Sequence, residues 1–362
     1  MVNLSIEVIG GKVVFQGGDV ISGNVIVDCK QPVDFKKLEI TYKGSAKTMW
    51  SEGSGDNRTT YVGKEPIFNQ TETLLKSTGQ KISPGRNLYP FQFQLPLELP
   101  SSFESPVELG YIRYRLQARL QQTLKSKRSQ LMFTVLEEVD LNKFPLAGEP
   151  AISQSSKTLC CWCCTSGLIE LEVRANKTGF VPGEFVTVSA SIKNGSSSKL
   201  RNCKLSIVQL ITLSSGYKSK LIRINLTKGA GVAKDCKKRS TITFDPQKIQ
   251  LPAVVPSHER LCRIIDVDYC VELICHTPLF SEKIRTWALL EVGTIPLNQG
   301  SNDETQGEGS TNMPASDFSV PAPTYAAATA VTIPKSEENP EAVTFAPQYN
   351  YYDWSQTAFT YK

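Results

Sequence analysis

The sequence has little histidine and no motif for catalysis. Its two histidines are His258 and His276, so any catalytic triad or histidine-ligated metal would have to use one of them. Cys262 and Cys275 lie near these histidines, but a cysteine and a histidine that are adjacent on a strand point to opposite faces. Neither a glycine-rich phosphate loop followed by a helix nor a paired-carboxylate motif is present. The sequence therefore predicts no enzymatic activity, no cofactor and no catalytic metal.

Long apolar segments are absent as well. No run approaches the ~18 apolar residues that a membrane-spanning helix needs, and residues 1–6 lack the basic region and apolar core of a secretory signal. We therefore expect a cytoplasmic protein with no transmembrane segment. In that reducing compartment, the ten cysteines are expected to be free thiols packed as small apolar groups.

Charge is distributed unevenly along the chain. Residues 299–362 contain two lysines and eight acids, a net charge of −6, so the remaining residues must carry +11 to give the overall +5. A basic body favours contact with anionic surfaces such as lipid head groups, phosphorylated peptides or acidic cytoplasmic tails. The candidate lipid or phosphate contacts are Lys125, Lys127, Arg128, Lys237, Lys238 and Arg239. These clusters have no interleaved aromatics, which argues against nucleic acid, and solvated loop lysines are the simpler explanation of each.

Alternation of apolar and polar side chains, in contrast, is abundant. It runs through residues 37–42, 112–121 and 267–275, with glycine and proline between such segments. Each segment is expected to bury one face of a strand and expose the other. No segment shows a helical period over about 12 residues or more. The pattern predicts an all-β chain built as antiparallel β-sandwiches.

Two stretches of the chain are copies of one another. Leu95–Glu104 returns as Leu251–Arg260, and Phe15–Val25 matches Phe180–Ala190 in the same order. A repeat of roughly 155 residues is far too long for a solenoid unit. It predicts two related domains in tandem.

The composition places the boundaries of these domains. The expected segments are a first domain at 1–145, a linker with a cysteine cluster at 146–166, a second domain at 167–298 and a tail at 299–362. The tail is rich in glycine, serine, proline, alanine and acids, so it cannot bury enough apolar surface to offset the entropy of ordering. We expect it to be disordered.

Two local features have competing explanations. Residues 52–78 form a long polar stretch with one expected strand at 68–75, and they are either a partner-contacting loop or a tolerated insertion. The cluster Cys160, Cys161, Cys163 and Cys164 surrounds Trp162. It could be reversibly palmitoylated, or it could be a set of buried thiols at an inter-domain seam. Zinc is the weaker alternative, since the spacing lacks the loop between two Cys-x₂₋₄-Cys knuckles.

Six segments in a fixed order resemble a known family. They are Gly17–Gly23, Tyr89–Pro96 with Leu99–Glu104, Ile112–Tyr114, Lys157–Trp162, Gly179–Glu184 and Val292–Leu297. Together they resemble the arrestin family, and specifically the α-arrestins (arrestin domain-containing proteins). The resemblance implies two arrestin-type β-sandwiches in tandem with no enzymatic activity of their own.

The resemblance also implies a function. Members act as trafficking adaptors that bind membrane-protein cargo, such as receptors or transporters, at the plasma membrane and endosomes. They recruit a WW-domain HECT-type ubiquitin ligase through Pro-Pro-x-Tyr motifs in the tail, and the cargo is then internalised or sorted. Two alternatives stay open. One is a coat-like sorting subunit, as in retromer. The other is a receptor-desensitising arrestin, which would need charged groups buried between its domains and a short amphipathic helix where residues 97–110 are broken by proline and serine.

The tail departs from the family pattern at its motifs. The ligase-binding candidates are Pro321, Pro323, Tyr325, Pro347 and Tyr349, in Pro-Ala-Pro-Thr-Tyr and Ala-Pro-Gln-Tyr. A WW domain holds a polyproline helix in an aromatic groove and the tyrosine in a separate slot. Replacing the first proline by alanine removes one packing surface, so we expect weakened binding that depends on avidity. The alternative is that both motifs are ordinary residues of a disordered tail.

Overall fold

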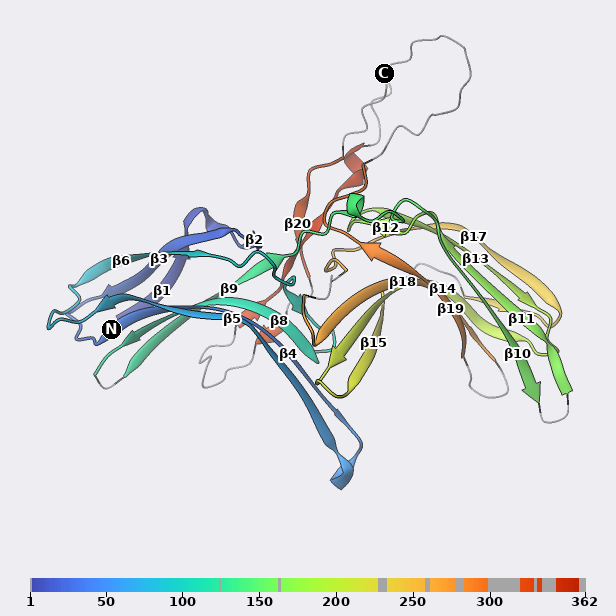
Figure 1. Cartoon of the computed structure of the whole chain (residues 1–362), viewed down its shortest axis with the longest axis horizontal. Helices are drawn as coiled ribbons and strands as arrows, with labels where there is room; N and C mark the ends of the chain where they lie inside the picture. The colour runs from blue at the N-terminus through green and yellow to red at the C-terminus, as the bar shows by residue number, and fades with distance from the viewer. Residues whose placement is uncertain are drawn as a thin grey trace, which may run out of the picture.

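The computed structural model shows a chain made almost entirely of β-strands (Figure 1). It describes residues 2–123, 125–161, 164–226, 233–257, 261–277, 283–298, 320–328, 331–333 and 343–357. These ranges contain no α-helix, only the 3₁₀ turns η1 (Ile9–Gly11), η2 (Gly55–Asn57), η3 (Leu141–Lys143) and η4 (Trp354–Thr357). No helix among them is long and apolar enough to cross a membrane. The all-β prediction is confirmed.

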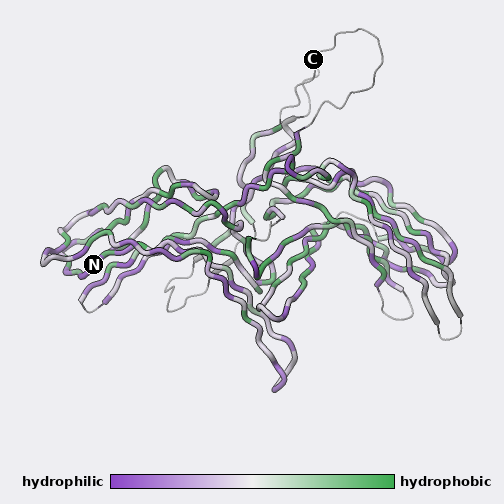
Figure 2. Tube along the Cα trace, in the orientation of Figure 1, coloured by the Kyte–Doolittle hydropathy of each residue, from purple (hydrophilic) through white to green (hydrophobic). Residues whose placement is uncertain are grey.

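The N-terminal domain packs two sheets face to face, and most of their strands are antiparallel. One has the strand order β1 (Val2–Val8), β3 (Val20–Cys29), β6 (Gly85–Gln94). The other has the order β2 (Val14–Gln16), β9 (Ser126–Leu136), β8 (Gly110–Gln121), β4 (Lys37–Glu52), β5 (Thr59–Lys76), with β7 (Phe103–Glu104) beside β8. Along β4 every second side chain, from Leu38 to Trp50, is buried. Figure 2 shows the same alternation of hydrophobic and hydrophilic residues along many strands, which is why these segments form a sandwich.

The C-terminal domain has the same plan. One sheet has the order β10 (Ala151–Cys161), β11 (Cys164–Ala175), β13 (Phe185–Asn194), β17 (Ser240–Gln250). The other has the order β12 (Gly179–Phe180), β19 (Lys283–Val292), β18 (Ile265–His276), β14 (Leu200–Ser214), β15 (Ser219–Asn225), with β16 (Lys234–Cys236) beside β14. The two domains lie end to end in the molecule (Figure 1).

The duplicated segments occupy equivalent places in the two domains. The Tyr114 hydroxyl of β8 donates to the carbonyl of Pro100 at 2.6 Å, and the Tyr269 hydroxyl of β18 donates to the carbonyl of Val255 at 2.5 Å. The short strand β2 pairs in parallel with β9, just as β12 pairs with β19. The sequence repeat is therefore a repeat of tertiary contacts as well.

Two segments contain more strand than the sequence predicted, which for residues 52–78 was one strand at 68–75. Residues 52–78 contain the 18-residue β5, which pairs with β4 along its whole length in a hairpin that projects from the sheet (Figure 1). Most of the linker expected at 146–166 is β10 and the start of β11. Both have exposed polar residues because sheet edges and hairpin ends face solvent, and polarity there does not distinguish a strand from a loop.

Part of the tail is also structured, which corrects the expectation of disorder for residues 320–328, 331–333 and 343–357. Strand β20 (Thr324–Ala327) pairs with β23 (Gln348–Tyr351), and β21 (Val331–Ile333) pairs with β22 (Val343–Phe345). This pair of two-stranded ladders lies beside the junction of the two domains (Figure 1).

Candidate functional site

The two domains are joined by backbone hydrogen bonds at their connector. The Val139 N–H donates to Thr294 Oγ1 at 2.8 Å, and the Thr294 N–H donates to the Val139 carbonyl at 2.8 Å. The Ile295 N–H donates to the same carbonyl at 3.0 Å. Thr294 is buried, so water cannot replace these bonds and the connector is held to the end of the C-terminal domain.

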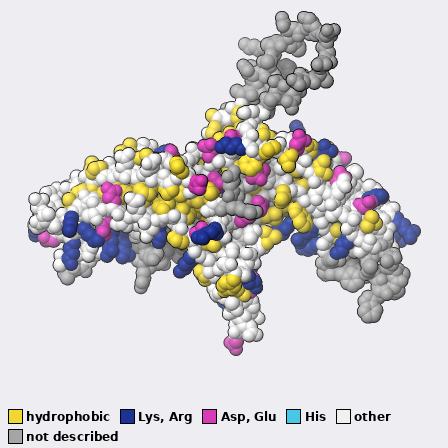
Figure 3. All heavy atoms as spheres, viewed as in Figure 1, with side chains coloured by type: hydrophobic (Ala, Val, Ile, Leu, Met, Phe, Trp, Pro, Cys, Tyr) yellow, Lys and Arg dark blue, Asp and Glu magenta, His cyan; other side chains and the backbone are white. Residues whose placement is uncertain are grey.

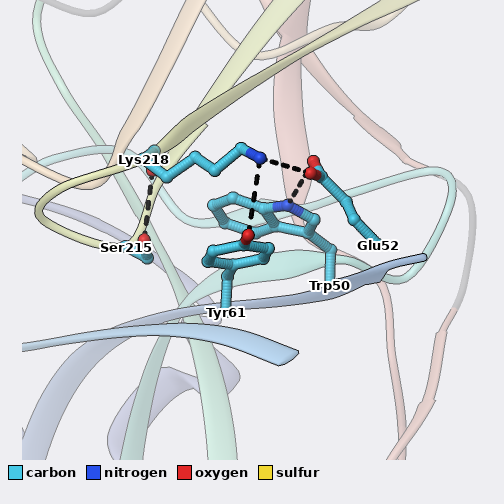
Figure 4. Close-up of polar contacts among 5 residues, drawn as sticks. All are labelled: Trp50, Glu52, Tyr61, Ser215 and Lys218. Atoms are coloured by element: carbon cyan, nitrogen blue, oxygen red, sulfur yellow. Dashed lines mark hydrogen bonds and ion pairs between the residues drawn. The ribbon is translucent and has the colours of Figure 1, made fainter. Parts of the chain in front are cut away.

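The projecting β4–β5 hairpin makes a second contact between the domains (Figure 4). Lys218, in the turn before β15, forms an ion pair with Glu52, and its ammonium lies 4.8 Å from the centre of the Tyr61 ring. Trp50 stacks on Tyr61 at 5.4 Å and donates its indole N–H to Glu52 at 3.1 Å. The hydrogen bond from Lys218, with a smaller contribution from the Trp50 indole, holds the pKa of the Glu52 carboxyl below its usual value. The C-terminal domain thus binds the side of the hairpin.

A buried carboxylate lies in this second contact. Glu65 of β5 is 9% exposed and accepts from the backbone N–H of Arg263 at 2.9 Å and from its Nε at 3.1 Å. The Arg263 side chain is itself 81% exposed. The Cys262 thiol lies 3.6 Å from the same carboxylate, and burial, with a smaller contribution from Glu65, raises its pKa to about 11. This thiol stays protonated at neutral pH, so it has little nucleophilic character.

A third contact is made by the tail segment 345–354, which we call the strap. Its first half binds the N-terminal domain. The Tyr349 hydroxyl donates to the carbonyl of Ser102 at 3.1 Å, and the Gln348 N–H donates to Thr134 Oγ1 at 3.1 Å. Tyr349 is only 4% exposed, and burial raises the pKa of its phenol well above the usual value. Pro347 is buried as well.

The second half of the strap binds the C-terminal domain. The Tyr352 hydroxyl donates to the carbonyl of Thr294 at 2.6 Å, and the Tyr352 N–H donates to the carbonyl of Pro182 at 3.0 Å. Tyr352 is 4% exposed and packs in a small apolar cluster with Leu141 and Val181. The strap therefore has one buried tyrosine in each domain. We call its contact residues the strap site; they are Ser102, Thr134, Pro182, Gly183 and Thr294.

The two tail motifs differ in their exposure to solvent. Tyr325 is 56% exposed and the preceding Pro323 is exposed too, whereas Pro347 and Tyr349 are buried in the strap. Both motifs belong to one hairpin, because Tyr325 pairs with Asn350 across β20 and β23. The two motif tyrosines thus lie on neighbouring strands, but only the first motif presents its tyrosine to solvent.

The outer face of the β4–β5–β8–β9 sheet is strongly basic. Three pairs of like charges lie directly opposite one another on it, Lys43 with Arg115, Lys47 with Lys64, and Arg119 with Arg128. Like charges in this arrangement cost stability. The acids Glu39 and Glu104 on this side are ion-paired with Lys37 and Arg113. Lys and Arg gather along this lower side of the N-terminal domain in Figure 3. We call the six cations of the three like-charged pairs the basic face; they are Lys43, Lys47, Lys64, Arg115, Arg119 and Arg128.

The structure does not bring the two expected basic clusters together. Lys125, Lys127 and Arg128 lie at the start of β9, where Arg128 belongs to the basic face. Lys237, Lys238 and Arg239 are exposed in the turn between β16 and β17, in the other domain. Each cluster is therefore a separate surface.

The cysteine cluster lies away from the strap site. The β10–β11 hairpin ends at the pair Cys161 and Cys164, at the far end of the C-terminal domain (Figure 1). Whether the cluster is palmitoylated or consists of buried thiols stays a prediction, because it concerns side chains that the structure does not describe. The side chains of Cys160, Cys161, Cys163 and Cys164 lie outside the described residues, as does His258. No group of three or more metal-ligating side chains occurs in the described ranges.

The sequence alone did not identify Tyr352, Thr294 and Gly183 as candidate site residues. One signal could have found the strap: residues 349–354, Tyr-Asn-Tyr-Tyr-Asp-Trp, contain four aromatics in six positions. Disordered segments contain few aromatic residues, so this density indicates a segment that packs against something. Its partner surface has no comparable signal, because it is assembled from both domains.

Both domains of this chain match known protein families. Residues 4–142 match the sequence model of "Arrestin (or S-antigen), N-terminal domain", and residues 165–297 match that of "Arrestin (or S-antigen), C-terminal domain". The chain is 29% identical over 355 residues to arrestin domain-containing protein 17 of Caenorhabditis elegans, covering 90% of this chain and 79% of the relative. It is also 29% identical over 321 residues to arrestin domain-containing protein 4 of Homo sapiens, covering 84% and 72%.

Proposed function

This chain belongs to the arrestin family, in its α-arrestin branch, and from that premise we propose that it is a non-enzymatic adaptor for the trafficking of membrane proteins. In this role the rigid pair of sandwiches binds cargo such as a receptor or transporter, and the tail recruits a WW-domain HECT-type ubiquitin ligase. The protein would act in the cytoplasm and be recruited to the plasma membrane and endosomes, where ubiquitinated cargo is internalised or sorted.

The observation that carries the ligase link is the first tail motif. Pro323 and Tyr325 are exposed beside a two-domain body of the family, so a WW domain can reach the tyrosine that its slot requires. The missing first proline of the family pattern predicts weak binding, which a second motif or several WW domains in one ligase would strengthen through avidity.

The basic face supports the cargo side of the proposal. An anionic partner, such as an acidic cytoplasmic segment of cargo or a charged lipid surface, would relieve the repulsion between Lys47 and Lys64. The receptor-desensitising alternative is less well supported. Residues 97–110 contain no helix, and the buried Glu65 is paired with an arginine that is mostly exposed.

The test is capture of a WW-domain ligase by the full chain. The chain with Tyr325→Ala and Tyr349→Ala should capture much less than the unaltered chain, since both tyrosine contacts are lost. Phe substitutions at exposed tyrosines outside the motifs, such as Tyr217→Phe, serve as the control. Equal capture by the double variant would contradict the ligase link and favour the coat-like sorting role.

A further inference from the structure

We propose that the strap site is a binding site for the chain's own tail, and that this site and a WW domain compete for Tyr349. The inference rests on the proposed ligase link. It adds that a WW domain cannot bind the second motif while the strap is bound to the body. Conversely, the strap cannot connect the two domains while a WW domain holds this motif.

The first argument is that the same side chains cannot occupy both sites. A WW domain takes the proline of the motif on an aromatic groove and the tyrosine in a slot. In the structure Pro347 is buried, and Tyr349 is 4% exposed with its hydroxyl bonded to the Ser102 carbonyl.

The second argument is that the strap site fits residues outside the motif. Gly183 has φ +94°, and a Cβ there would lie 2.0 Å from the Tyr352 carbonyl oxygen. The strap backbone therefore approaches where only glycine leaves room. The Tyr352 hydroxyl bonds to the Thr294 carbonyl at 2.6 Å, and Asn350 Nδ2 donates to the same carbonyl at 3.2 Å. These contacts fix the strap in its site, and the strap residues that make them lie outside the motif Ala346–Tyr349.

The third argument is that the strap bridges the domains. Its tyrosines are bound to different domains, Tyr349 at Ser102 and Tyr352 at Thr294. Thr294 also bonds to the connector through Val139. Release of the strap therefore removes an inter-domain contact next to the connector, while the hairpin contact at Glu65 is left in place. By linkage, a ligand that captures Tyr349 favours the arrangement of the domains without the strap.

The competition has a measurable size. The apparent Kd of a WW domain for the second motif is the intrinsic Kd divided by the fraction of chains with the strap released. Minor states of this kind are commonly populated at 0.1–10%. We therefore expect binding to the full chain about ten-fold or more weaker than binding to the free tail peptide.

The experiment compares the full chain with its own tail peptide. A single WW domain is titrated with a peptide of residues 341–357 and with the full chain carrying Tyr325→Ala, so that only the second motif is read. Gly183→Ala in the same background is expected to raise the affinity of the full chain towards that of the peptide, because the strap loses its place. Gly79→Ala is the matched control: Gly79 has φ +97° and open space around its Cβ, so it carries the same backbone strain without touching the strap.

The outcomes separate the two proposals. Equal affinity for the peptide and the full chain, or no gain in Gly183→Ala over Gly79→Ala, overturns the competition even if the ligase link holds. If neither the peptide nor the chain binds, the ligase role of this motif is wrong and the competition falls with it. Hydrogen exchange of residues 345–354 then still tests the strap site by itself, since faster exchange in Gly183→Ala supports it and unchanged exchange excludes it. Tyr352→Ala, which leaves Ala346–Tyr349 intact, should reproduce the effect of Gly183→Ala.

Discussion

At the scale of single residues, Thr294 is where the two domains and the strap meet. Its hydroxyl accepts from Val139 in the connector and its carbonyl accepts from Tyr352 in the strap. The side chain therefore contributes to stability through a hydrogen bond that buried surroundings do not allow water to replace.

This contribution can be measured with Thr294→Val. The valine keeps the shape of the side chain but leaves the buried Val139 N–H without its acceptor, so the free energy of unfolding should fall by about 1–3 kcal/mol. Urea unfolding of the full chain is the measurement. Thr59→Val, at an exposed position of β5, should change the free energy by less than about 0.5 kcal/mol. Similar effects of both variants would show that the Thr294 bond is not a stabilising contact.

At the scale of elements, the β4–β5 hairpin is the largest departure from the sequence-based expectation. Its second strand has an irregular burial pattern, with a run of exposed residues from Asn69 to Thr73. This strand is at the edge of its sheet, so neither face is covered along its whole length and period-2 alternation is lost. Only its partner in the other domain reveals why Gly63 and Glu65 are buried.

The fit of the hairpin to the C-terminal domain can be tested with Gly63→Ala. A Cβ at Gly63 would lie 2.3 Å from the Ser214 carbonyl oxygen, so the hairpin has to move away from the turn before β15. We expect a loss of about 1–3 kcal/mol in the free energy of unfolding and faster hydrogen exchange at 213–218. Gly148→Ala, whose Cβ would have open space, should leave both unchanged. Unaltered exchange at 213–218 in Gly63→Ala would argue against a close contact there.

At the scale of the whole molecule, the basic face is one continuous row of cations on the outer sheet of the N-terminal domain. Arg128 belongs both to the basic face and to the cluster with Lys125 and Lys127. The cations of the basic face therefore add to the positive potential around this cluster. The cluster at 237–239 is an exposed turn in the other domain. A charged lipid surface should therefore respond more to the first cluster than to the second.

Binding to vesicles that contain phosphatidylserine tests this difference. Neutralising Lys125, Lys127 and Arg128 together with glutamine should weaken binding by about 1 kcal/mol per charge at low salt. Neutralising Lys237, Lys238 and Arg239 in the same way should weaken it less, and both effects should shrink as salt is raised. Equal losses for the two triple variants would show that overall charge, and not the basic face, determines lipid contact.

The two tandem β-sandwiches and the family could both be predicted from the sequence alone. Alternation such as that from Leu38 to Tyr42 reports burial of one strand face, and the repeated Tyr114 and Tyr269 segments carry the same local contacts in each domain. The full extent of β5, the exposure of Tyr325 and the burial of Tyr349 follow from tertiary contacts and could not be predicted from the sequence. The physical reason is range: a strand pattern is set by neighbours two residues away. The place of the strap depends on carbonyls of Ser102 and Thr294 that two separately folded domains bring together.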